Sequence, residues 1–372
     1  MKTANGHEII QWFEQFSPKR YAMEGDKIGL QIGTLNKPVK KVMITLDVLD
    51  SVVDEAIAKE IDLIIAHHPP IFRALPHVTD GNAAGRIVTK CIKHDISVYV
   101  AHTNLDIAVG GVNDMLADAI GLVDSKVLVP TLTEELRKLS VFVPVSHAED
   151  LRAALGEAGA GHIGNYSHCS FSSVGEGRFL PMEGTDPFIG KQGALEKVEE
   201  VKVETIYPVS LEKKVLNAMK KAHPYEEVAY DIFALKNEGE TLGLGRVGKL
   251  AEPMTLTEFA QHVKRTLDVE NVRVVGGSDV MVKKVAVVGG DGNKYINHAK
   301  FAGADVYVTG DLYFHTAHDA MAIGLNVVDP GHYAEKIMKK GTADKLVAAA
   351  SDCKWELEVV VSESNTDPFT FM

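Results

Sequence analysis

Residues 39–66 read VKKVMITLDVLDSVVDEAIAKEIDLIIA, and this stretch decides the fold class. The apolar run at 42–47 is typical of a buried strand, residues 49–59 have helical spacing, and residues 62–66 form a second apolar run. A third run follows at 96–101. Strands that alternate with helices predict βαβ units around a largely parallel sheet.

The same plan returns near the end of the chain. Two pairs of segments match at an offset of 243 residues: VKKV at 39–42 with 282–285, and DLII at 62–65 with DVYV at 305–308. The offset falls to 229 for ISVY at 96–99 and LNVV at 325–328, so we place an excursion of 14 extra residues within IFRALPHVTDGNAAGR of the first copy. Chance likeness between apolar strands is the alternative. We predict an internal repeat, and hence two similar α/β halves with parallel-rich sheets.

The segment between the two copies has a different character. Residues 133–238 read twice as strand, helix and strand, which predicts a ferredoxin-like α+β domain inserted into a larger one. We therefore expect residues 1–132 and 239–372 to come together as the halves of one α/β core. Gly161 to Phe171 and HPYEE at 223–227 are interpreted as turn and packing elements, with ligand binding as the alternative.

Composition and charge narrow the class of protein. The 372 residues are 45% hydrophobic and 24% charged, with a formal net charge of −12. A phosphate backbone is repelled by such a chain, so nucleic acid is not an expected partner. No apolar run approaches the ~20 residues of a membrane helix. Three widely spaced cysteines and an N-terminus without an apolar signal region favour a cytoplasmic location.

Residues suited to metal binding stand directly after the predicted strands. In parallel sheets, ligands lie beyond the carboxyl ends of the strands. The residues that follow the four strands are His67 and His68, His102 and Asp106, Asp311 and His315, and His332 and Glu335. The repeat, at its offset of 229, also places Asp106 on Glu335. An HH pair or an HxxE motif alone is more often structural, and only their joint position at equivalent strand ends favours a metal site.

These residue types predict two divalent cations per chain, Zn, Mn or Fe, with Zn favoured. The predicted ligands are His67, His68, Asp106, His332 and Glu335. The last two are three apart and share a face if a helix begins there. The first two can diverge toward two cations in the turn that Pro69-Pro70 stiffens, and a carboxylate can bridge the cations. His102 and His315 are predicted to act as a general acid or base, or to orient a ligand.

A glycine-rich turn, Gly289-Gly290-Asp291-Gly292, follows another apolar strand. It lacks the lysine of a phosphate-binding P-loop and does not match GxGxxG, so we interpret it as a tight turn. Neither a GxSxG motif nor a cysteine beside an obvious histidine partner indicates covalent hydrolase chemistry.

The motifs together resemble the GTP cyclohydrolase 1 type 2 homolog family, also called the Nif-three-like family. The matching residues are His67-His68-Pro69, Thr103-Asn104-Leu105-Asp106, Thr309-Gly310-Asp311 with His315, and Gly331-His332 with Glu335. The resemblance covers essentially the whole chain and implies two α/β halves around a dinuclear metal site with the five ligands above. It also implies a PII-like (CutA-like) domain at 133–238 and a homohexamer, a trimer of dimers. Several members space the final His and Glu four apart rather than three, and either spacing keeps one helical face.

Three functions remain open. The first is a metal-dependent hydrolase, where the family name implies opening of the purine ring of GTP and His102 or His315 would move the proton. The second is hydrolysis of a phosphoester or a cyclic amide by the same metals. The third is a non-enzymatic, metal-binding regulatory assembly whose inserted domain senses a small ligand.

Overall fold

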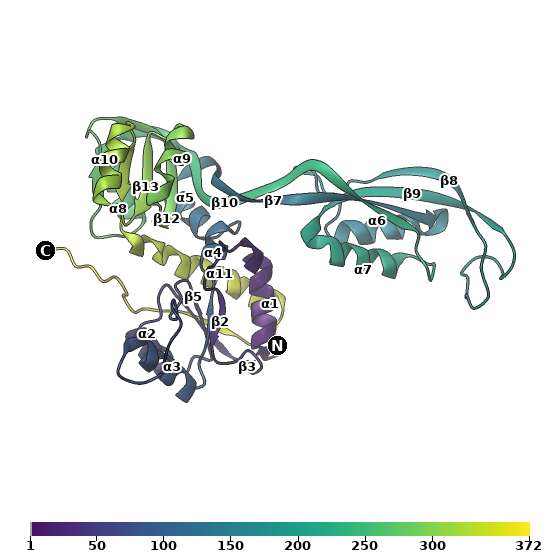
Figure 1. Ribbon diagram of the computed structural model, residues 1–372, viewed down its shortest axis with the longest axis horizontal. Coiled ribbons are helices and arrows are strands. Elements are labelled where there is room, and N and C mark those ends of the chain that lie inside the picture. Colours follow the sequence, from purple (N-terminus) through teal and green to yellow (C-terminus); the bar gives the residue numbers. More distant parts are fainter. Residues whose placement is uncertain (1) are drawn as a thin grey trace. The chain divides into compact units, whose positions relative to one another are not determined.

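The structure is a computed structural model that describes residues 2–372. Its chain contacts divide it into two compact units (Figure 1). The first unit joins the chain up to Thr131 with Leu242–Met372, and the second comprises Leu132–Thr241. Within the described residues, every helix is too short or too polar to cross a membrane.

The first half of the first unit is a five-stranded sheet in the order β15-β4-β5-β6-β2. The strands β15, β4, β5 and β6 run parallel to one another, and the edge strand β2 runs antiparallel to β6. Their bounds are β2 (Gly29–Ile32), β4 (Lys41–Thr45), β5 (Leu63–Ala66), β6 (Ser97–Val100) and β15 (Glu358–Val361). One face packs on α2 (Asp50–Ala58) and α3 (Ala83–Lys93). The other packs on α1 (Gly6–Phe16).

The second half repeats this plan. Its parallel strands are β12 (Met281–Asp291), β13 (Val306–Gly310) and β14 (Asn326–Asp329), flanked by β11 (Arg273–Val275) and by the long strands β10 and β7. Its helices are α8 (Leu256–Thr266), α9 (Ile296–Phe301) and α10 (Phe314–Ala322). The remaining elements of the unit are β1 (Ala4–Asn5), β3 (Pro38–Val39), α4 (Thr103–Ile107), α5 (Val112–Ala119), α11 (Ile337–Asp352) and the 3₁₀ turns η1 (Lys19–Tyr21), η4 (Asn293–Tyr295) and η5 (His332–Lys336).

Matching hydrogen bonds from backbone amides to an aspartate side chain confirm the internal repeat. In the first copy, the amides of Lys40 and Lys41 donate to Asp62 Oδ2 at 2.7 and 2.9 Å. In the second, the amides of residues 283 and 284 donate to Asp305 Oδ2 at 2.9 and 2.7 Å. An equivalent aspartate, Asp62 or Asp305, therefore fixes the start of β4 in one copy and the first part of β12 in the other. The predicted excursion is also present, as the long connection from β5 to α3.

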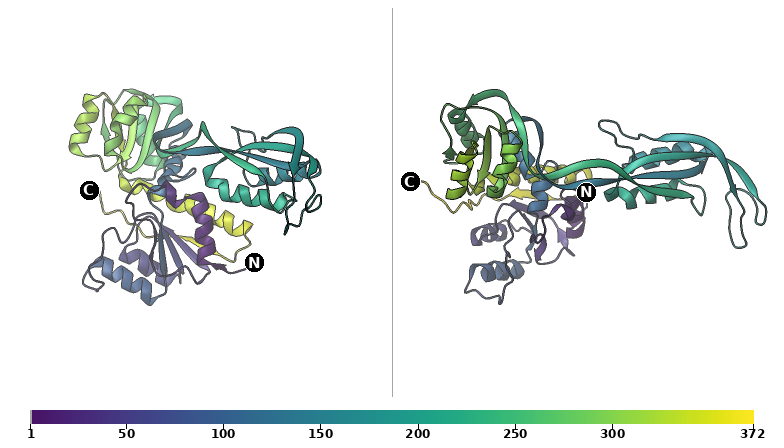
Figure 2. Two further views of the ribbon diagram at one scale, coloured as in Figure 1. Left: turned by 45° about the vertical axis from the view of Figure 1, so that its right-hand side comes forward. Right: turned by 45° about the horizontal axis from the view of Figure 1, so that its top comes forward.

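The two halves share one apolar core. It contains Ile9 of α1, Leu116 of α5, Phe259 of α8, Val285 of β12 and Met338 of α11, all nearly inaccessible to solvent. Helix α11 lies beside α1 in the left view of Figure 2. Because residues from both ends of the chain build this core, the carboxyl ends of the two parallel sheets are held in one unit.

The second unit is an antiparallel sheet with two helices on one face. Its elements are the second part of β7 (Leu122–Pro144), η2 (Val145–His147), α6 (Ala148–Glu157), β8 (Phe171–Phe179), β9 (Glu196–Pro208), η3 (Val209–Leu211), α7 (Glu212–Ala222) and the first part of β10 (Tyr230–Thr255). The strand order β10-β7-β9-β8 with the sequence βαββαβ is a split βαβ, ferredoxin-like arrangement. Alternate residues of β7 and β9, such as Val141 and Val203, pack against Leu151 of α6 and Met219 of α7. The finer likeness to PII-like domains stays a prediction.

Candidate metal centre

The two adjacent histidines are fixed by the strand that precedes them. The amide of His67 donates to Thr45 O at 3.2 Å and that of His68 donates to Leu46 O at 2.8 Å, which extends the β4–β5 pairing past the end of β5. His67 is completely buried, and His68 keeps some exposure. The chain leaves the sheet at this point, so the two side chains are free of strict strand alternation.

Side chains from both halves converge at this edge. The Nε2 atom of His67 lies 3.6 Å from Asp106 Oδ1 and 3.8 Å from Glu335 Oε2. The Nε2 atoms of His68 and His332 each lie 3.2 Å from the same oxygen of Glu335. The structure thus brings together all five residues that the sequence analysis selected as metal ligands.

The ligand-type atoms form three overlapping groups, each with its atoms within 4.8 Å of one another. One group is His67, Asp106 and Glu335, and another is His68, His332 and Glu335. Glu335 is therefore common to both. The third group combines the two adjacent histidines with His102. His102, selected as a catalytic candidate, thus lies within the cluster itself.

Every imidazole of the cluster is oriented through its Nδ1–H. His67 donates to Ala101 O at 2.9 Å. The other three donate to carboxylates: His68 to Asp47 at 2.7 Å, His102 to Asp26 at 2.8 Å, and His332 to Asp311 at 2.7 Å. Histidines that bind metals through Nε2 are held in this way by carbonyls and carboxylates behind them.

Two of these supporting acids, Asp47 and Asp26, were not predicted from the sequence. Asp47 lies two residues after β4, so the rule that led to the other candidates, a polar residue just beyond a parallel strand, would have found it. Asp26 precedes β2 in an irregular segment and offers no such signal. Its carboxylate also accepts hydrogen bonds from the backbone and hydroxyl of Thr103, which ties the segment to the start of α4.

Two buried atoms at the centre have no hydrogen-bond partner among the described residues. They are His67 Nε2 and Asp106 Oδ1. Because Nδ1 of His67 carries the proton, its Nε2 presents a lone pair toward Asp106 Oδ1, and at 3.6 Å the two atoms are too far apart for a hydrogen bond. A buried polar atom without a partner costs about 1–3 kcal/mol. Such a donor set, lone pairs facing one another, fits a cation between them.

The histidines of the cluster differ in the direction of their pKa shifts. Burial lowers the pKa of His67 to about 3, so this imidazole is neutral. Burial also opposes protonation of His68 and His332, but hydrogen bonds to carboxylates outweigh it and raise their pKa to about 10 and about 9. Burial and the Glu335 charge raise the pKa of Asp106. For Glu335 itself, the hydrogen bonds from His332 and His68 overcome burial and lower the pKa well below the ordinary value. His67 is therefore neutral, whereas His68 and His332 form charge-assisted hydrogen bonds with Glu335.

The spacing of His332 and Glu335 suits the local backbone. They lie in η5, a 3₁₀ turn, where residues three apart lie directly above one another. The predicted shared face is present, and α11 begins only at Ile337. Glu335 is 3% exposed and points inward, toward the first half.

The glycine-rich turn after β12 lies against the cluster. A Cβ on Gly290 would lie 3.0 Å from both Glu335 Oε1 and His332 Nε2, and one on Gly289 would lie 2.7 Å from the same oxygen. Gly290 also has a φ of +59°, in the left-handed region that glycine adopts most easily. These glycines allow the backbone to approach the cluster, which is a more specific role than the tight turn read from the sequence.

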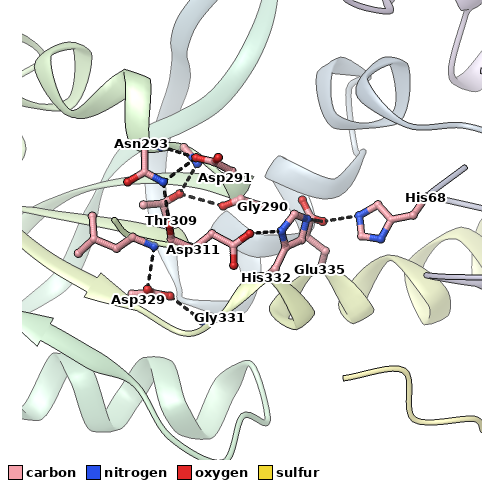
Figure 3. A network of polar contacts seen from close by, with 12 residues as sticks. His68, Gly290, Asp291, Asn293, Thr309, Asp311, Asp329, Gly331, His332 and Glu335 are labelled. Carbon is pink, nitrogen blue, oxygen red and sulfur yellow. Dashed lines mark hydrogen bonds and ion pairs between the residues drawn. The ribbon is translucent and has the colours of Figure 1, made fainter. Parts of the chain in front are cut away.

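A polar network joins this turn to Asp311 (Figure 3). Asn293 Nδ2 donates to Asp291 Oδ1 at 2.6 Å and to the carbonyl of Asp311 at 2.8 Å. Thr309 Oγ1 donates to Gly290 O at 3.0 Å. Asp311, with a φ of +52°, is thus held in position to accept the Nδ1–H of His332.

His315, the other catalytic candidate, lies elsewhere on the second half. It is exposed on α10 and contacts the ring of Phe314, with centroids 5.4 Å apart. Among the described residues, no hydrogen bond or ion pair joins it to the cluster.

A cavity of 640 Å³ opens beside the cluster, and His68 and His332 form part of its wall. Tyr333 and Phe369 give it aromatic surface, and Lys336 gives it a positive charge. Residues 365–369 and 371 of the C-terminal segment also line the cavity. Thr366 links this segment to Asp47 by a hydrogen bond, and Glu55 accepts hydrogen bonds from residues 362–364.

Comparisons with known proteins agree with this architecture. The model of the Duf34/NIF3 (NGG1p interacting factor 3) family matches residues 4–368. The GTP cyclohydrolase 1 type 2 homolog of Bacillus subtilis (strain 168) is 65% identical over 371 residues, covering 100% of both chains. The crystal structure of the Bacillus cereus protein related to NIF3 has a TM-score of 0.95 at 60% identity, again over 100% of both chains. Staphylococcus aureus protein SA1388 has a TM-score of 0.77 at 32% identity over 100% of both chains.

Proposed function

Because this chain belongs to the Duf34/NIF3 family, whose relatives carry the name GTP cyclohydrolase 1 type 2 homolog, we propose that it is a metal-dependent hydrolase with a dinuclear centre. One observation carries the proposal. The buried, unpartnered atoms His67 Nε2 and Asp106 Oδ1 converge with Glu335 Oε2, so that ligands from both halves surround one point.

Two cations suit the grouping and the charge of the ligands. One cation would be held by His67, Asp106 and Glu335, and the other by His68, His332 and Glu335, so that Glu335 bridges them. With neutral imidazoles, the acids in or directly behind the cluster carry five negative charges, those of Asp26, Asp47, Asp106, Asp311 and Glu335. Two divalent ions would offset four of these charges. Imidazole-rich sites of this kind favour Zn, and Mn or Fe fit the same ligands.

The protein's own groups supply orientation and proton transfer. When bound, such cations act as Lewis acids and make water reactive near neutral pH. His102 has its Nδ1–H fixed by Asp26, so Nε2 is the ring atom left to accept or donate a proton beside His67 and His68. We propose His102 as the general acid or base. A catalytic role for His315 stays a prediction from the sequence.

The adjoining cavity supports a nucleotide as the substrate. Its 640 Å³ volume is typical of small-molecule sites. Tyr333 and Phe369 offer surfaces on which a base can stack, and Lys336, paired with Asp268 at 3.0 Å, can turn to a phosphate. GTP is the first nucleotide to test because the relatives are named for it.

The test is to incubate metal-loaded protein with GTP and measure formate and the pterin precursor. We expect product from the wild type, none from Glu335→Gln, and undiminished product from Glu356→Gln, an exposed acid of similar charge. Metal content by elemental analysis should fall only in the first variant. Formate release that persists in E335Q, or that survives removal of the metal, would refute the proposed centre.

Hydrolysis of a phosphoester is the second candidate, and the lysine on the cavity wall favours it. A panel of phosphodiesters and cyclic imides, assayed with Mn and Zn, separates it from GTP ring opening. The third candidate, a non-enzymatic regulatory assembly, requires that no panel member turns over while the metal is retained.

We also propose the homohexamer, with residues 133–238 as a separate PII-like domain and a cytoplasmic location. Sedimentation of the purified protein tests the assembly.

A further inference from the structure

The second unit contains a cavity of its own, with a volume of 260 Å³. It is built entirely from residues between 178 and 229, and the candidate metal ligands take no part in it. The HPYEE motif at 223–227, interpreted from the sequence as a packing element, contributes to its wall. Its lining combines aromatic rings with carboxylates, and this arrangement favours a positively charged ligand.

Three aromatic rings line the space. The rings of Phe179 and Phe188 lie 5.7 and 6.4 Å from that of Tyr225, measured between centroids. The linker between β8 and β9 carries Phe188 and adds Pro181 and Pro187 to the lining. The faces of aromatic rings are electron-rich, so such an enclosure attracts an organic cation.

A buried carboxylate forms the polar part of the wall. Glu200 is 9% exposed, and its Oε1 accepts a hydrogen bond from the Tyr225 hydroxyl at 3.0 Å. Its Oε2 has no hydrogen-bond donor within residues 2–372. A Cβ on Gly177, across the β8–β9 pair, would lie 2.1 Å from Oε2, so any larger residue there would displace the carboxylate from this position. The wall thus presents a carboxylate oxygen that can accept a hydrogen bond from a ligand.

The other charged side chains around the cavity also favour a positively charged ligand. Glu226 and Glu227 lie at the exposed part of the lining. The one basic side chain of the lining, Arg178, is paired with Glu176 at 2.6 Å. The nearby His223 is kept neutral because burial lowers its pKa.

A metal ion fits this cavity poorly. Both ring nitrogens of His223 are occupied, since Nε2–H donates to Phe142 O at 2.8 Å and Nδ1 accepts from the Tyr225 amide at 3.1 Å. Among the described residues of the second unit, no three ligand-type atoms converge closely enough for a cation.

We propose that this cavity binds a small organic ammonium ion with an apolar body. Its N–H groups would donate to Glu200 Oε2, and its body would pack among Phe179, Phe188 and Tyr225. A primary arylalkylamine matches both the size of the cavity and its lining.

Calorimetry on the full-length protein tests this with two probes of nearly equal shape, phenethylamine and the neutral 2-phenylethanol. We expect the amine to bind at least tenfold more tightly than the alcohol. The variant Glu200→Gln should weaken amine binding at least tenfold. Its matched control is Glu199→Gln, the neighbouring exposed acid of β9, which is absent from the lining and should leave binding unchanged.

Several results would overturn the assignment: equal binding of the two probes, no heat from the amine at millimolar concentration, or an unchanged dissociation constant in E200Q. If E200Q does not fold, Phe188→Leu replaces it. This side chain is 54% exposed, so its loss leaves the core intact and should weaken amine binding about fivefold. Displacement of the amine by MnCl₂ in the wild type, abolished in the same variants, would instead assign a metal site.

Discussion

Replacing Asp311 by Asn removes one negative charge behind His332 and leaves the local shape in place. Asp311 Oδ2 accepts the Nδ1–H of His332 at 2.7 Å, and the amide oxygen of Asn can accept the same bond. The φ of residue 311 is +52°, a left-handed value that Asn tolerates better than most residues. The variant D311N therefore isolates the electrostatic support of one predicted ligand.

The magnitude follows from the type of hydrogen bond. A bond to a charged acceptor contributes about 1.5–3 kcal/mol and a neutral one about 0.5–1.5 kcal/mol. The loss of about 1.4 kcal/mol corresponds to a roughly tenfold weaker affinity for the metal. This value lies at the lower end of the roughly 10–100-fold effects seen when the outer partner of a metal-binding histidine is changed.

The assay is competition for Zn against a chromogenic chelator, with circular dichroism to verify folding. Asp319→Asn is the matched control, because Asp319 is exposed on α10. We expect D311N to bind Zn about tenfold more weakly and D319N to match the wild type. An affinity for D311N within twofold of the wild type, or an equal loss in the control, would refute the assignment of His332 as a ligand supported by Asp311.

Three further predictions rest on single residues. Gly290→Ala should lower both the urea midpoint and the metal content, because its Cβ would crowd the cluster; Gly121→Ala, with a φ of +77° and nothing within 4 Å, should affect stability alone. The hydrogen bonds to Glu55 outweigh its burial and lower its pKa to about 2. Its stabilisation of residues 362–364 is therefore complete above the unfolded pKa near 4.5 and is lost as the pH falls toward 2. Amide protection factors of that segment should fall between pH 5 and pH 3 in the wild type, and should be low at both in E55Q. Burial raises the pKa of the Cys91 thiol to about 11, so iodoacetamide should modify the exposed Cys353 in the native protein and Cys91 only after unfolding, as mass spectrometry can verify.

The sequence was informative where the chemistry depends on position along a strand. Polar residues directly after apolar runs marked His67, His68, Asp106, His332 and Glu335, because the carboxyl end of a parallel strand is also the point where side chains become free to converge. The repeat of VKKV and the Asp-led strand revealed the two halves, since the same carboxylate clamp is used in each. These features are local in sequence and need no knowledge of packing.

Other features depend on tertiary contacts that no spacing encodes. Asp26 reaches His102 across 76 residues, from a segment without regular structure. His102 and His315 both follow parallel strands, yet one lies in the cluster and the other is exposed on α10. A position just beyond a parallel strand shows which residues can reach the site. The helix that follows the strand determines which of these residues does reach it.

Both copies of the repeat contribute residues to the proposed metal centre. One copy would supply His67, His68 and Asp106, and the other would supply His332 and Glu335, so neither copy alone holds all the residues of the proposed centre. The carboxylates Asp106 and Glu335 come from opposite halves and repel each other when both are ionised, while the shared apolar core presses the halves together. A cation between them would turn that repulsion into attraction. In the proposed centre, metal binding and the packing of the halves would therefore be coupled by the same pair of charges, and the glycines at 289 and 290 allow the second sheet to approach Glu335 closely.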